Sequence, residues 1–500
     1  MSFRKKMIYR VARTLTRHHQ REYLRAPQCQ DLIFRQLIAR GLATRFGKQH
    51  DFAGIRNYRD YVERVPVRDY EDIKPWIDEI RKGDRDVLWP GRPRYLCKTS
   101  GTTSGAKYIP ITRESMGNQI RSARTSLFHY ISKHPETDVF GGKMFFLSGS
   151  PRLDQGGIIP VGRLSGIVNH EIPAWFQSNK LPGYELNCTE PWEAKIDALT
   201  HFIQGQDIRV ISGIPPWVQM FCEQLLLKTG KDNVCQLFPK LELYVHGGVN
   251  FTPYAARIRN LFGRDVALLE TYPASEGFIA FQDDECDPGL QLVVNDGIFF
   301  EFIPKSEVHL PHAQRLRLTE VSTGVDYAVV LTTNAGLWSY LIGDLVRFTS
   351  LNPYKIAVSG RISQFISAFG EHVIGSEIDQ AMRYAQEAHR FDFVEFTVAP
   401  QVSPSDNKHP YHEWYIEFSE IPRNLHEIAL TINSRLCELN SYYKDLIDGK
   451  LLDTLRIRPV RKNAFLNYMR RVGRLGEQFK VHRLSNDRRV ADDLANDILP

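Results

Sequence analysis

The chain has 500 residues, of which 42% are hydrophobic and 24% charged, with 64 Lys and Arg against 58 Asp and Glu. This length exceeds what one hydrophobic core usually serves, so we expect at least two domains. The composition is ordinary for a globular protein, so a disordered chain is not expected. The net charge of +6 is too small to predict a dedicated nucleic-acid-binding protein. Seven cysteines without a Cys-x-x-Cys pair argue against a disulfide framework or zinc knuckle and favour the cytoplasm, and no run reaches the roughly 18 apolar residues of a membrane span.

The first 90 residues or so are predicted to be mostly helical, because Ile33, Leu37 and Ile38 recur at helical spacing. The segment begins with a basic stretch that contains Arg4, Lys5, Lys6, Arg10, Arg13, Arg17, Arg21 and Arg25. Such a stretch is compatible with an anionic membrane surface, a transit peptide or a solvated helix face. A solvated face is the commonest case, and we assign the stretch no function.

A loop of small residues follows at 98–110, with four hydroxyl side chains and two glycines between Ser100 and Gly105. Hydroxyls and glycines allow a backbone to fold around a phosphate chain and donate hydrogen bonds to it. The loop is not a P-loop, because only three residues separate Gly101 from Gly105 and Tyr108 follows Lys107. Clusters of this kind also form turns that bind nothing, so the loop alone leaves both interpretations open.

Downstream, short apolar segments alternate with helical ones and end in small or polar residues. This pattern is typical of buried strands in an α/β sheet, at whose carboxyl ends ligands bind. We therefore expect an active site along that edge of the sheet. The runs are 145–147 before Ser148, 208–211 before Ser212, 241–245 before His246-Gly247-Gly248, and 266–269 before Glu270-Thr271-Tyr272.

Three further motifs combine residues that could bind a nucleotide. Tyr272 offers a ring for a purine, and Glu276 beside a triphosphate is most simply a magnesium ligand. Asp344, at the end of the segment 336–344, is either a turn residue or an acceptor for ribose hydroxyls. Lys480, within 476–483, is either a solvent-exposed lysine or a catalytic one. Each motif is weak alone.

The composition changes again at 352–361, and the residues beyond it predict a compact α+β unit. We expect a helix that begins with a capping box of Ser376 and Asp379, a second helix over 425–439, and strands over 393–398 and 414–418. The predicted fold class is α/β, with a large N-terminal α/β domain whose sheets are flanked by helices (1–360) and a smaller C-terminal α+β domain (361–500).

In their joint order these motifs resemble the adenylate-forming superfamily, which includes acyl-CoA synthetases and luciferases. Within it, the chain resembles the Gretchen Hagen family of auxin-responsive acyl acid-amido synthetases. The resemblance covers nearly the whole chain, including the segments 44–50, 65–67 and 439–443.

This resemblance implies a role for each matching residue. Ser100, Gly101, Thr102 and Thr103 would hold the phosphates of ATP, Tyr272 would lie against adenine, and Asp344 would accept from the ribose hydroxyls. Glu276 would bind Mg²⁺, and Gly247 and Gly248 would border the adenine and acyl pocket. Lys480 would swing in with a mobile C-terminal domain, about a hinge near 359–361, to assist catalysis.

The chain departs from the plant members of the family at two places. Plant members usually have Tyr-Arg-Tyr-Arg where this chain has Trp338-Ser339-Tyr340-Leu341, and lysine where it has His372. Two cationic side chains near the nucleotide are therefore absent or replaced, and an indole substrate is not to be assumed.

The resemblance implies a ligase that activates a carboxylic acid as its acyl adenylate and transfers the acyl group to an amine, an amino acid by family analogy. An acyl-CoA ligase and a non-catalytic acyl-ligand binding protein remain alternatives. We expect a cytoplasmic monomer with ATP and Mg²⁺ as cofactors and a small carboxylic acid and an amine as partners. No nucleic-acid or membrane partner is expected.

Overall fold

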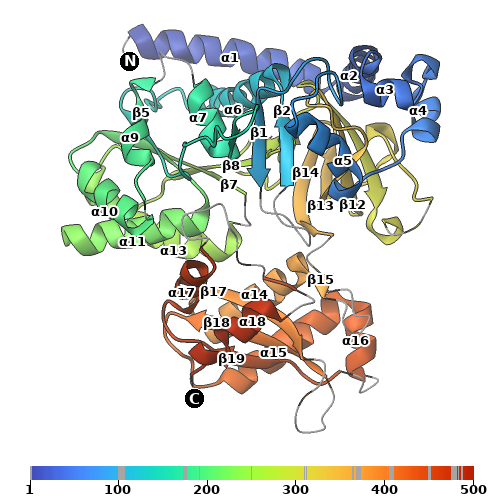
Figure 1. Ribbon diagram of the computed structural model, residues 1–500. Helices are drawn as coiled ribbons and strands as arrows, with labels where there is room; N and C mark the ends of the chain where they lie inside the picture. Colours follow the sequence, from blue (N-terminus) through green and yellow to red (C-terminus); the bar gives the residue numbers. More distant parts are fainter. Residues whose placement is uncertain are drawn as a thin grey trace. The chain divides into compact units, whose positions relative to one another are not determined.

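The computed structural model folds into two compact units, of which unit 1 comprises Met1–Ile342 and Val346–Val358, and unit 2 comprises Gly343–Leu345 and Ser359–Pro500 (Figure 1). The domain division predicted at residue 360 stays a prediction. The structure describes residues 3–99, 107–172, 177–190, 192–248, 251–308, 310, 312–362, 365–366, 373–401, 404, 410–448, 452–473, 481, 483–485 and 488–499.

The largest sheet that the described residues form has eleven strands. Its order is β11 (Ile298–Pro304), β12 (Asp326–Thr333), β13 (Tyr340–Leu351), β14 (Tyr354–Arg361), β10 (Leu290–Leu292), β9 (Gly277–Gln282), β8 (Ala267–Ala274), β7 (Leu243–Gly247), β6 (Ile208–Ser212), β3 (Lys143–Phe146) and β5 (Lys180–Leu181). The strands from β5 to β8 run parallel, whereas the pairs β8–β9, β9–β10, β10–β14 and β11–β12 are antiparallel.

The parallel strands are buried on both faces, which is why their sequences are almost continuously apolar. On one face Leu243 and Leu269 pack with residues of α1 (Phe3–Tyr23) and α6 (Arg113–Lys133). On the other face Phe145 lies 4.8 Å from Phe221 in α11 (Pro215–Thr229), between ring centroids, and Tyr244 lies 5.7 Å from Phe262 in α13 (Thr252–Phe262).

The first part of the chain is helical, as its periodicity predicts. After α1 come α2 (Ala26–Gly41), α3 (Arg45–Gln49), α4 (Tyr58–Arg64) and α5 (Tyr70–Arg81). Later helices of unit 1 include α7 (Leu164–Glu171), α9 (Tyr184–Asn187), α10 (Trp192–Phe202) and α12 (Val234–Leu237). No described helix is both long and apolar enough to cross a bilayer.

Residues 352–361, where the composition changes, contain a strand of the large sheet. They are not only a boundary, because Tyr354–Arg361 forms β14, which pairs with β10 in the large sheet. The composition change at Asn352 and Pro353 marks the turn between β13 and β14 instead. Proline and asparagine favour turns wherever they lie, so a turn within a domain resembles a linker in sequence.

Unit 2 is an α+β unit, as predicted. Its three-stranded sheet has the order β17 (Phe393–Gln401), β18 (Tyr411–Phe418) and β19 (Arg456–Pro459). The other elements are β15 (Phe365–Ile366), β16 (Val373–Ile374), α14 (Gly375–His389), α15 (Leu425–Leu439), α16 (Ser441–Asp448), α17 (Ala464–Arg471) and α18 (Arg489–Leu494). The apolar faces predicted for the two long helices are buried, with Ile378 and Met382 in α14 and Ile428 and Ile432 in α15.

The capping box predicted for the first of these helices is wrong. The helix α14 begins at Gly375, so Ser376 already lies in its first turn. The carboxylate that accepts from a backbone N–H at the helix start belongs to Glu377, which bonds to Ile374 N at 2.9 Å. Asp379 instead forms an ion pair with Arg483 at 3.0 Å.

Candidate active site

The carboxyl ends of four parallel strands meet at one edge of unit 1, as the apolar runs predict. Leu147 N, after β3, donates to Ser212 O at 2.8 Å, and Gly213 N donates to Val245 O at 3.2 Å. Thr271 Oγ1 in β8 donates to His246 O in β7 at 3.0 Å. In open α/β sheets this edge is where ligands bind.

The loop of small residues connects the two strands of a hairpin. β1 (Tyr95–Thr99) pairs antiparallel with β2 (Lys107–Ile111), and Thr99 lies opposite Lys107 at the end of the ladder next to the loop. β1 also pairs in parallel with β4 (Val161–Gly162). The predicted phosphate-binding residues Ser100, Gly101, Thr102 and Thr103 lie outside the described residues.

One residue of β1 contacts the segment that contains Tyr272 and Glu276. Cys97 Sγ, in β1, donates to Ser275 Oγ at 3.3 Å. Burial raises the pKa of the Cys97 thiol to about 12, and the nearby carboxylate of Glu276 adds to the increase. The strand that leads into the hydroxyl-rich loop therefore contacts the turn that carries Glu276, although 178 residues separate Cys97 from Ser275.

Glu276 and Tyr272 lie at the end of the parallel half of the sheet. Glu276 is partly exposed in the turn between β8 and β9, whereas Tyr272 is 8% exposed within β8, opposite Ala280 of β9. The prediction that β8 ends before Glu270-Thr271-Tyr272 is wrong. The strand continues to Ala274 because β9 pairs with Thr271 and the residues that follow it.

Gly247 fits the edge for a steric reason. It lies opposite Thr271, and a Cβ atom on Gly247 would approach the carbonyl oxygen of Thr271 to 2.1 Å. Gly248 has a φ of +78°, a left-handed conformation that glycine adopts without strain. Both glycines that the sequence singles out therefore lie at the edge, with no side chain between the strand ends.

Replacing Gly247 with alanine is expected to destabilise the protein by about 1–3 kcal/mol, because β7 and β8 must separate to admit the methyl group. Urea denaturation measures the loss. Gly117→Ala is the matched control: it lies within α6, a Cβ there meets nothing within 4 Å, and alanine should be neutral or stabilising by up to about 1 kcal/mol. Equal stability of the two variants would contradict the steric argument.

Three ionisable residues near this edge have no predicted role. Lys195 in α10 is 2% exposed, and its Nζ donates to Ser148 O at 2.7 Å; burial lowers its pKa to about 8. His246 and Glu270 lie opposite each other in β7 and β8. Burial lowers the pKa of His246 to about 4 and raises that of Glu270 to about 6. The sequence places His246 and Glu270 directly after apolar runs but assigns them no chemistry, whereas nothing in the sequence around Lys195 distinguishes it from a surface lysine.

The third motif is mainly structural up to Tyr340. Trp338 Nε1 donates to Leu88 O at 2.9 Å, and Ser339, with a φ of +47°, is fully buried. Ser339 Oγ donates to Glu301 Oε2 at 3.1 Å and accepts from Arg315 Nη2. Ser339, one of the positions at which the chain departs from the plant-type motif expected above, is therefore a small residue inside a buried polar network.

Asp344 lies within a strand and not in a turn. It is a partly buried residue of β13, next to Gly343, whose φ is +88°. Asp344 belongs to unit 2, whereas Gly247, Tyr272 and Glu276 belong to unit 1. Lys480 and His372 lie outside the described residues.

Glu276 suits Mg²⁺ as a single carboxylate ligand. Within the part of the chain that the structure describes, no group of three or more His, Cys, Asp or Glu side chains could hold a metal ion. Mg²⁺ bound with nucleotides commonly uses one or two carboxylates, with phosphate oxygens and water completing its octahedron. A partly exposed carboxylate at the edge of the sheet matches that donor set.

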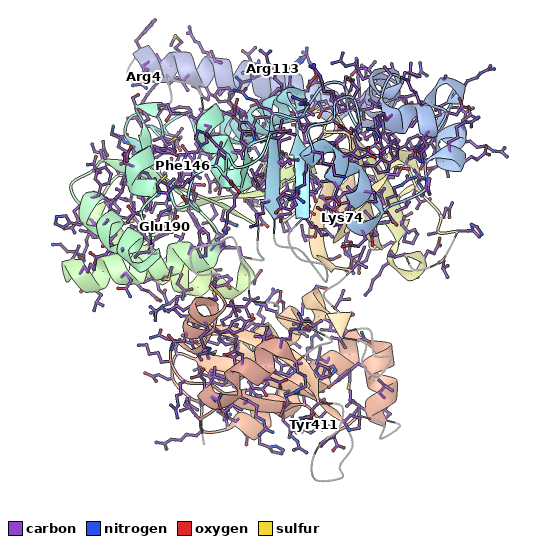
Figure 2. All side chains as sticks on the ribbon, viewed as in Figure 1. Arg4, Lys74, Arg113, Phe146, Glu190 and Tyr411 are labelled. Carbon is purple, nitrogen blue, oxygen red and sulfur yellow. The ribbon has the colours of Figure 1, made fainter. Side chains whose placement is uncertain are left out.

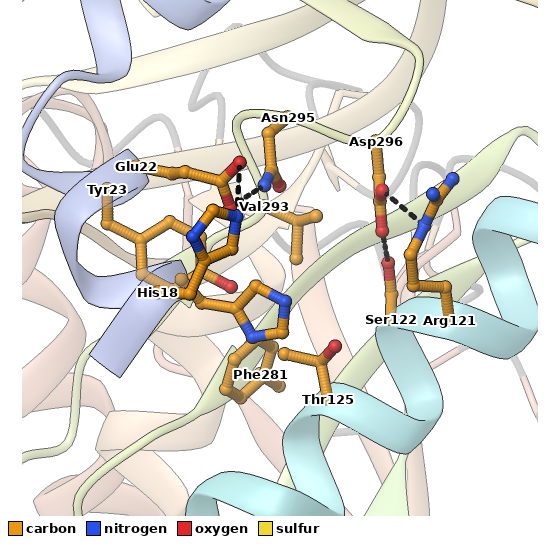
Figure 3. Close-up of a pocket in the computed structure, with 11 residues that line it drawn as sticks. His18, Glu22, Tyr23, Arg121, Ser122, Thr125, Phe281, Val293, Asn295 and Asp296 are labelled. Atoms are coloured by element: carbon orange, nitrogen blue, oxygen red, sulfur yellow. Dashed lines mark hydrogen bonds and ion pairs between the residues drawn. The ribbon is translucent and has the colours of Figure 1, made fainter. Parts of the chain in front are cut away.

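A separate polar pocket of about 180 Å³ lies between α1, α6 and the segment 293–296 (Figure 3). Its ionisable groups pair with one another: Arg121 Nε lies 2.8 Å from Asp296 Oδ1, and His18 Nε2 lies 3.5 Å from Glu22 Oε1. Burial is also the main reason that the pKa of Asp296 is raised and that of His19 lowered. None of the predicted site residues that the structure describes lines this pocket.

Most of the chain matches models of a known protein family. Three family models match the chain: the GH3 family N-terminal domain at residues 18–214, the GH3 family central domain at 291–361 and the GH3 family C-terminal domain at 376–489. The chain belongs to the GH3 family. The resemblance inferred from the motifs is confirmed.

Similar GH3 proteins are plant amido synthetases. The jasmonoyl-L-amino acid synthetase GH3.5 of Oryza sativa subsp. japonica is 22% identical, and the alignment covers 92% of each chain. The indole-3-acetic acid-amido synthetase GH3.3 of Arabidopsis thaliana is 22% identical over 91% of this chain and 88% of its own.

Solved structures confirm the fold class. The GH3.15 acyl acid amido synthetase superposes with a TM-score of 0.79 at 18% identity, covering 95% of this chain and 94% of its own. A 2-hydroxyisobutyryl-CoA ligase in complex with its acyl adenylate superposes with a TM-score of 0.61 at 15% identity, covering 95% and 91%. Both superpositions show a shared fold.

Proposed function

We propose that this GH3 protein is an ATP-dependent acyl acid-amido synthetase. It joins a carboxylic acid to ATP with release of pyrophosphate and then transfers the acyl group to an amine, by analogy with its relatives an amino acid. The observation that supports the proposal is the contact of Cys97, in the strand that leads into the hydroxyl loop, with Ser275, the residue before Glu276.

The first step needs positive charge and hydrogen-bond donors, because a carboxylate attacks the α-phosphorus of ATP, an anion against an anion. Ser100, Gly101, Thr102 and Thr103 would donate to the phosphates, and Lys480 would supply a cation. Mg²⁺ held by Glu276 would neutralise phosphate charge. Tyr272 would lie against adenine and Asp344 would accept from the ribose hydroxyls.

The second step needs no covalent bond to the protein. The acyl adenylate is a mixed anhydride, so a neutral amine attacks its carbonyl carbon and AMP leaves as the amide forms. The amine loses a proton in this step. Gly247 and Gly248 would border the adenine and acyl pocket, since Gly247 puts no side chain at the edge where β7 and β8 lie in close contact.

We further propose that the protein works in the cytoplasm as a monomer. Its seven cysteines are all free thiols, as expected in a reducing compartment.

A screen of carboxylic acids against acceptors tests the function. Each acid is incubated with ATP and Mg²⁺, pyrophosphate release is measured, and products with amino acids or coenzyme A are identified by mass. We expect acid-dependent pyrophosphate release and an amide product. A thioester product alone would make the protein an acyl-CoA ligase, and binding of acids without pyrophosphate release would make it a non-catalytic binding protein.

A further inference from the structure

One face of the first helix packs against the rest of unit 1. Ala12, Thr16 and Tyr23 of α1 are buried, and Ile8 packs into a cluster with Tyr130 of α6 and Leu243 of β7. Thr16 Oγ1 donates to Phe128 O of α6 at 3.4 Å. The helix α1 is therefore a fixed part of the folded unit (Figure 1).

The opposite face of α1 exposes large apolar side chains. Phe3 is 84% exposed, Met7 52% and Val11 46%. Residues four apart lie next to one another on a helix, so these three form one ridge along the first half of α1. Single exposed apolar residues are common on protein surfaces and need no explanation. A row of three on a helix whose other exposed residues are mostly basic calls for one.

The same face carries a row of cations. The exposed bases, of which Arg4 is labelled in Figure 2, are Arg4, Lys6, Arg10, Arg13, Arg17 and Arg21. None of the six forms an ion pair with a described residue, and α1 contains one acidic residue, Glu22. Residues 1–25 carry eight Lys or Arg and one Glu, a net +7, so the rest of the chain sums to −1 against the total of +6.

The charge of this face limits what can cover it. A second copy of the chain would bring its own row of cations against the first, which is unfavourable. A nucleic acid would neutralise the cations, but its phosphate backbone offers no apolar phase for Phe3, Met7 and Val11. An anionic bilayer surface offers both, because its headgroups attract Lys and Arg while its acyl boundary accepts apolar side chains.

We propose that the outer face of α1 docks the folded protein on an anionic membrane surface. No membrane partner is expected from the sequence, because no segment could span a bilayer and because a basic helix face is most often simply solvated. Surface docking needs no spanning segment, and the apolar ridge distinguishes this face from a solvated one. The guanidinium groups pair with lipid phosphates, and the ridge enters the boundary between headgroups and acyl chains. The docking does not depend on the proposed reaction, because none of its residues belongs to the candidate active site.

Vesicle sedimentation of the full-length chain tests this proposal. We expect binding to phosphatidylcholine vesicles that contain about one third phosphatidylserine, and at least about tenfold weaker binding to phosphatidylcholine alone. Binding should weaken as salt rises, because ions screen the headgroup charge. Equal partition to the two vesicles, or none to either, would overturn the proposal.

Two sets of variants separate charge from insertion. Reversing Arg10, Arg13 and Arg17 to Glu should weaken binding at least about tenfold. After replacement of Phe3, Met7 and Val11 with Ser, the protein should still bind the anionic vesicles at low salt. It should no longer bind them at high salt, because only the screened charge attraction remains. The matched control reverses three exposed bases elsewhere on unit 1, Arg85, Lys231 and Arg259, and should bind nearly as the unmodified protein does.

Thermal unfolding of each variant checks that the fold is intact, since all the substituted residues are exposed. Equal losses in the charge variant and its control would show that net charge alone matters and would overturn the assignment to α1. If the protein bound an RNA duplex more tightly than the anionic vesicles, and the serine variant bound the duplex equally well, the face would be a nucleic-acid site instead.

Discussion

Replacing Glu276 with glutamine is expected to slow ATP–pyrophosphate exchange by about 10²- to 10³-fold, the loss typical of removing one preorganised electrostatic contact. Glutamine keeps the size of the side chain but lacks the charge that attracts Mg²⁺ to the turn between β8 and β9. Exchange is measured with an acid identified in the screen, over a series of Mg²⁺ concentrations. Part of the loss should recover at high Mg²⁺, because a weakened site fills again by mass action.

The control for this variant is Glu136→Gln. Glu136 is a carboxylate of unit 1 whose side chain is 74% exposed, paired only with His134 among the residues described. It should exchange pyrophosphate as the unmodified protein does. Undiminished exchange by Glu276→Gln at every Mg²⁺ concentration would remove Glu276 from the proposed metal site.

The parallel half of the sheet could be predicted because its strands are buried on both faces. Burial on both faces makes a strand such as Ile208–Ser212 a run that is apolar except for Arg209 and is followed by small residues, a pattern visible without a structure. The same reasoning failed at Glu270, because a polar residue there suggested the strand's end. The pairing that extends β8 comes from β7 at Glu270 and Thr271 and from β9 as far as Ala274, and backbone pairing leaves little trace in side-chain chemistry.

The order of the nucleotide motifs could also be predicted, whereas the polar groups that support them could not. Lys195 looks like an ordinary helical lysine, and only the structure shows its ammonium group buried against Ser148. The role of Ser339 depends on Glu301 and Arg315, which the chain brings to it from separate segments. Such contacts follow from tertiary packing, which periodicity does not encode.

The network around Ser339 gives the largest effect on stability that we expect. Replacing Arg315 with methionine should destabilise unit 1 by about 3–5 kcal/mol, because it leaves a buried carboxylate without its counter-charge. Arg315 Nη2 lies 2.6 Å from Glu301 Oε1, and the side chains are 5% and 0% exposed. Arg315 Nη1 also donates to Val65 O at 2.6 Å. Urea denaturation of the full-length protein measures the change.

Two comparisons show whether the unpaired charge is the cause. Arg347→Met breaks an ion pair with Asp326 in which the arginine is 50% exposed, and it should cost no more than about 1 kcal/mol. In the Arg315→Met background, Glu301→Met should restore most of the lost stability, because a buried ion pair can often be replaced by apolar residues at little cost. If the double variant were as unstable as Arg315→Met alone, the loss would come from packing and from the bonds to Val65 and Ser339. If the single variant failed to fold while the double variant folded, the charge would be the cause, and the third motif would depend on a neutralised Glu301.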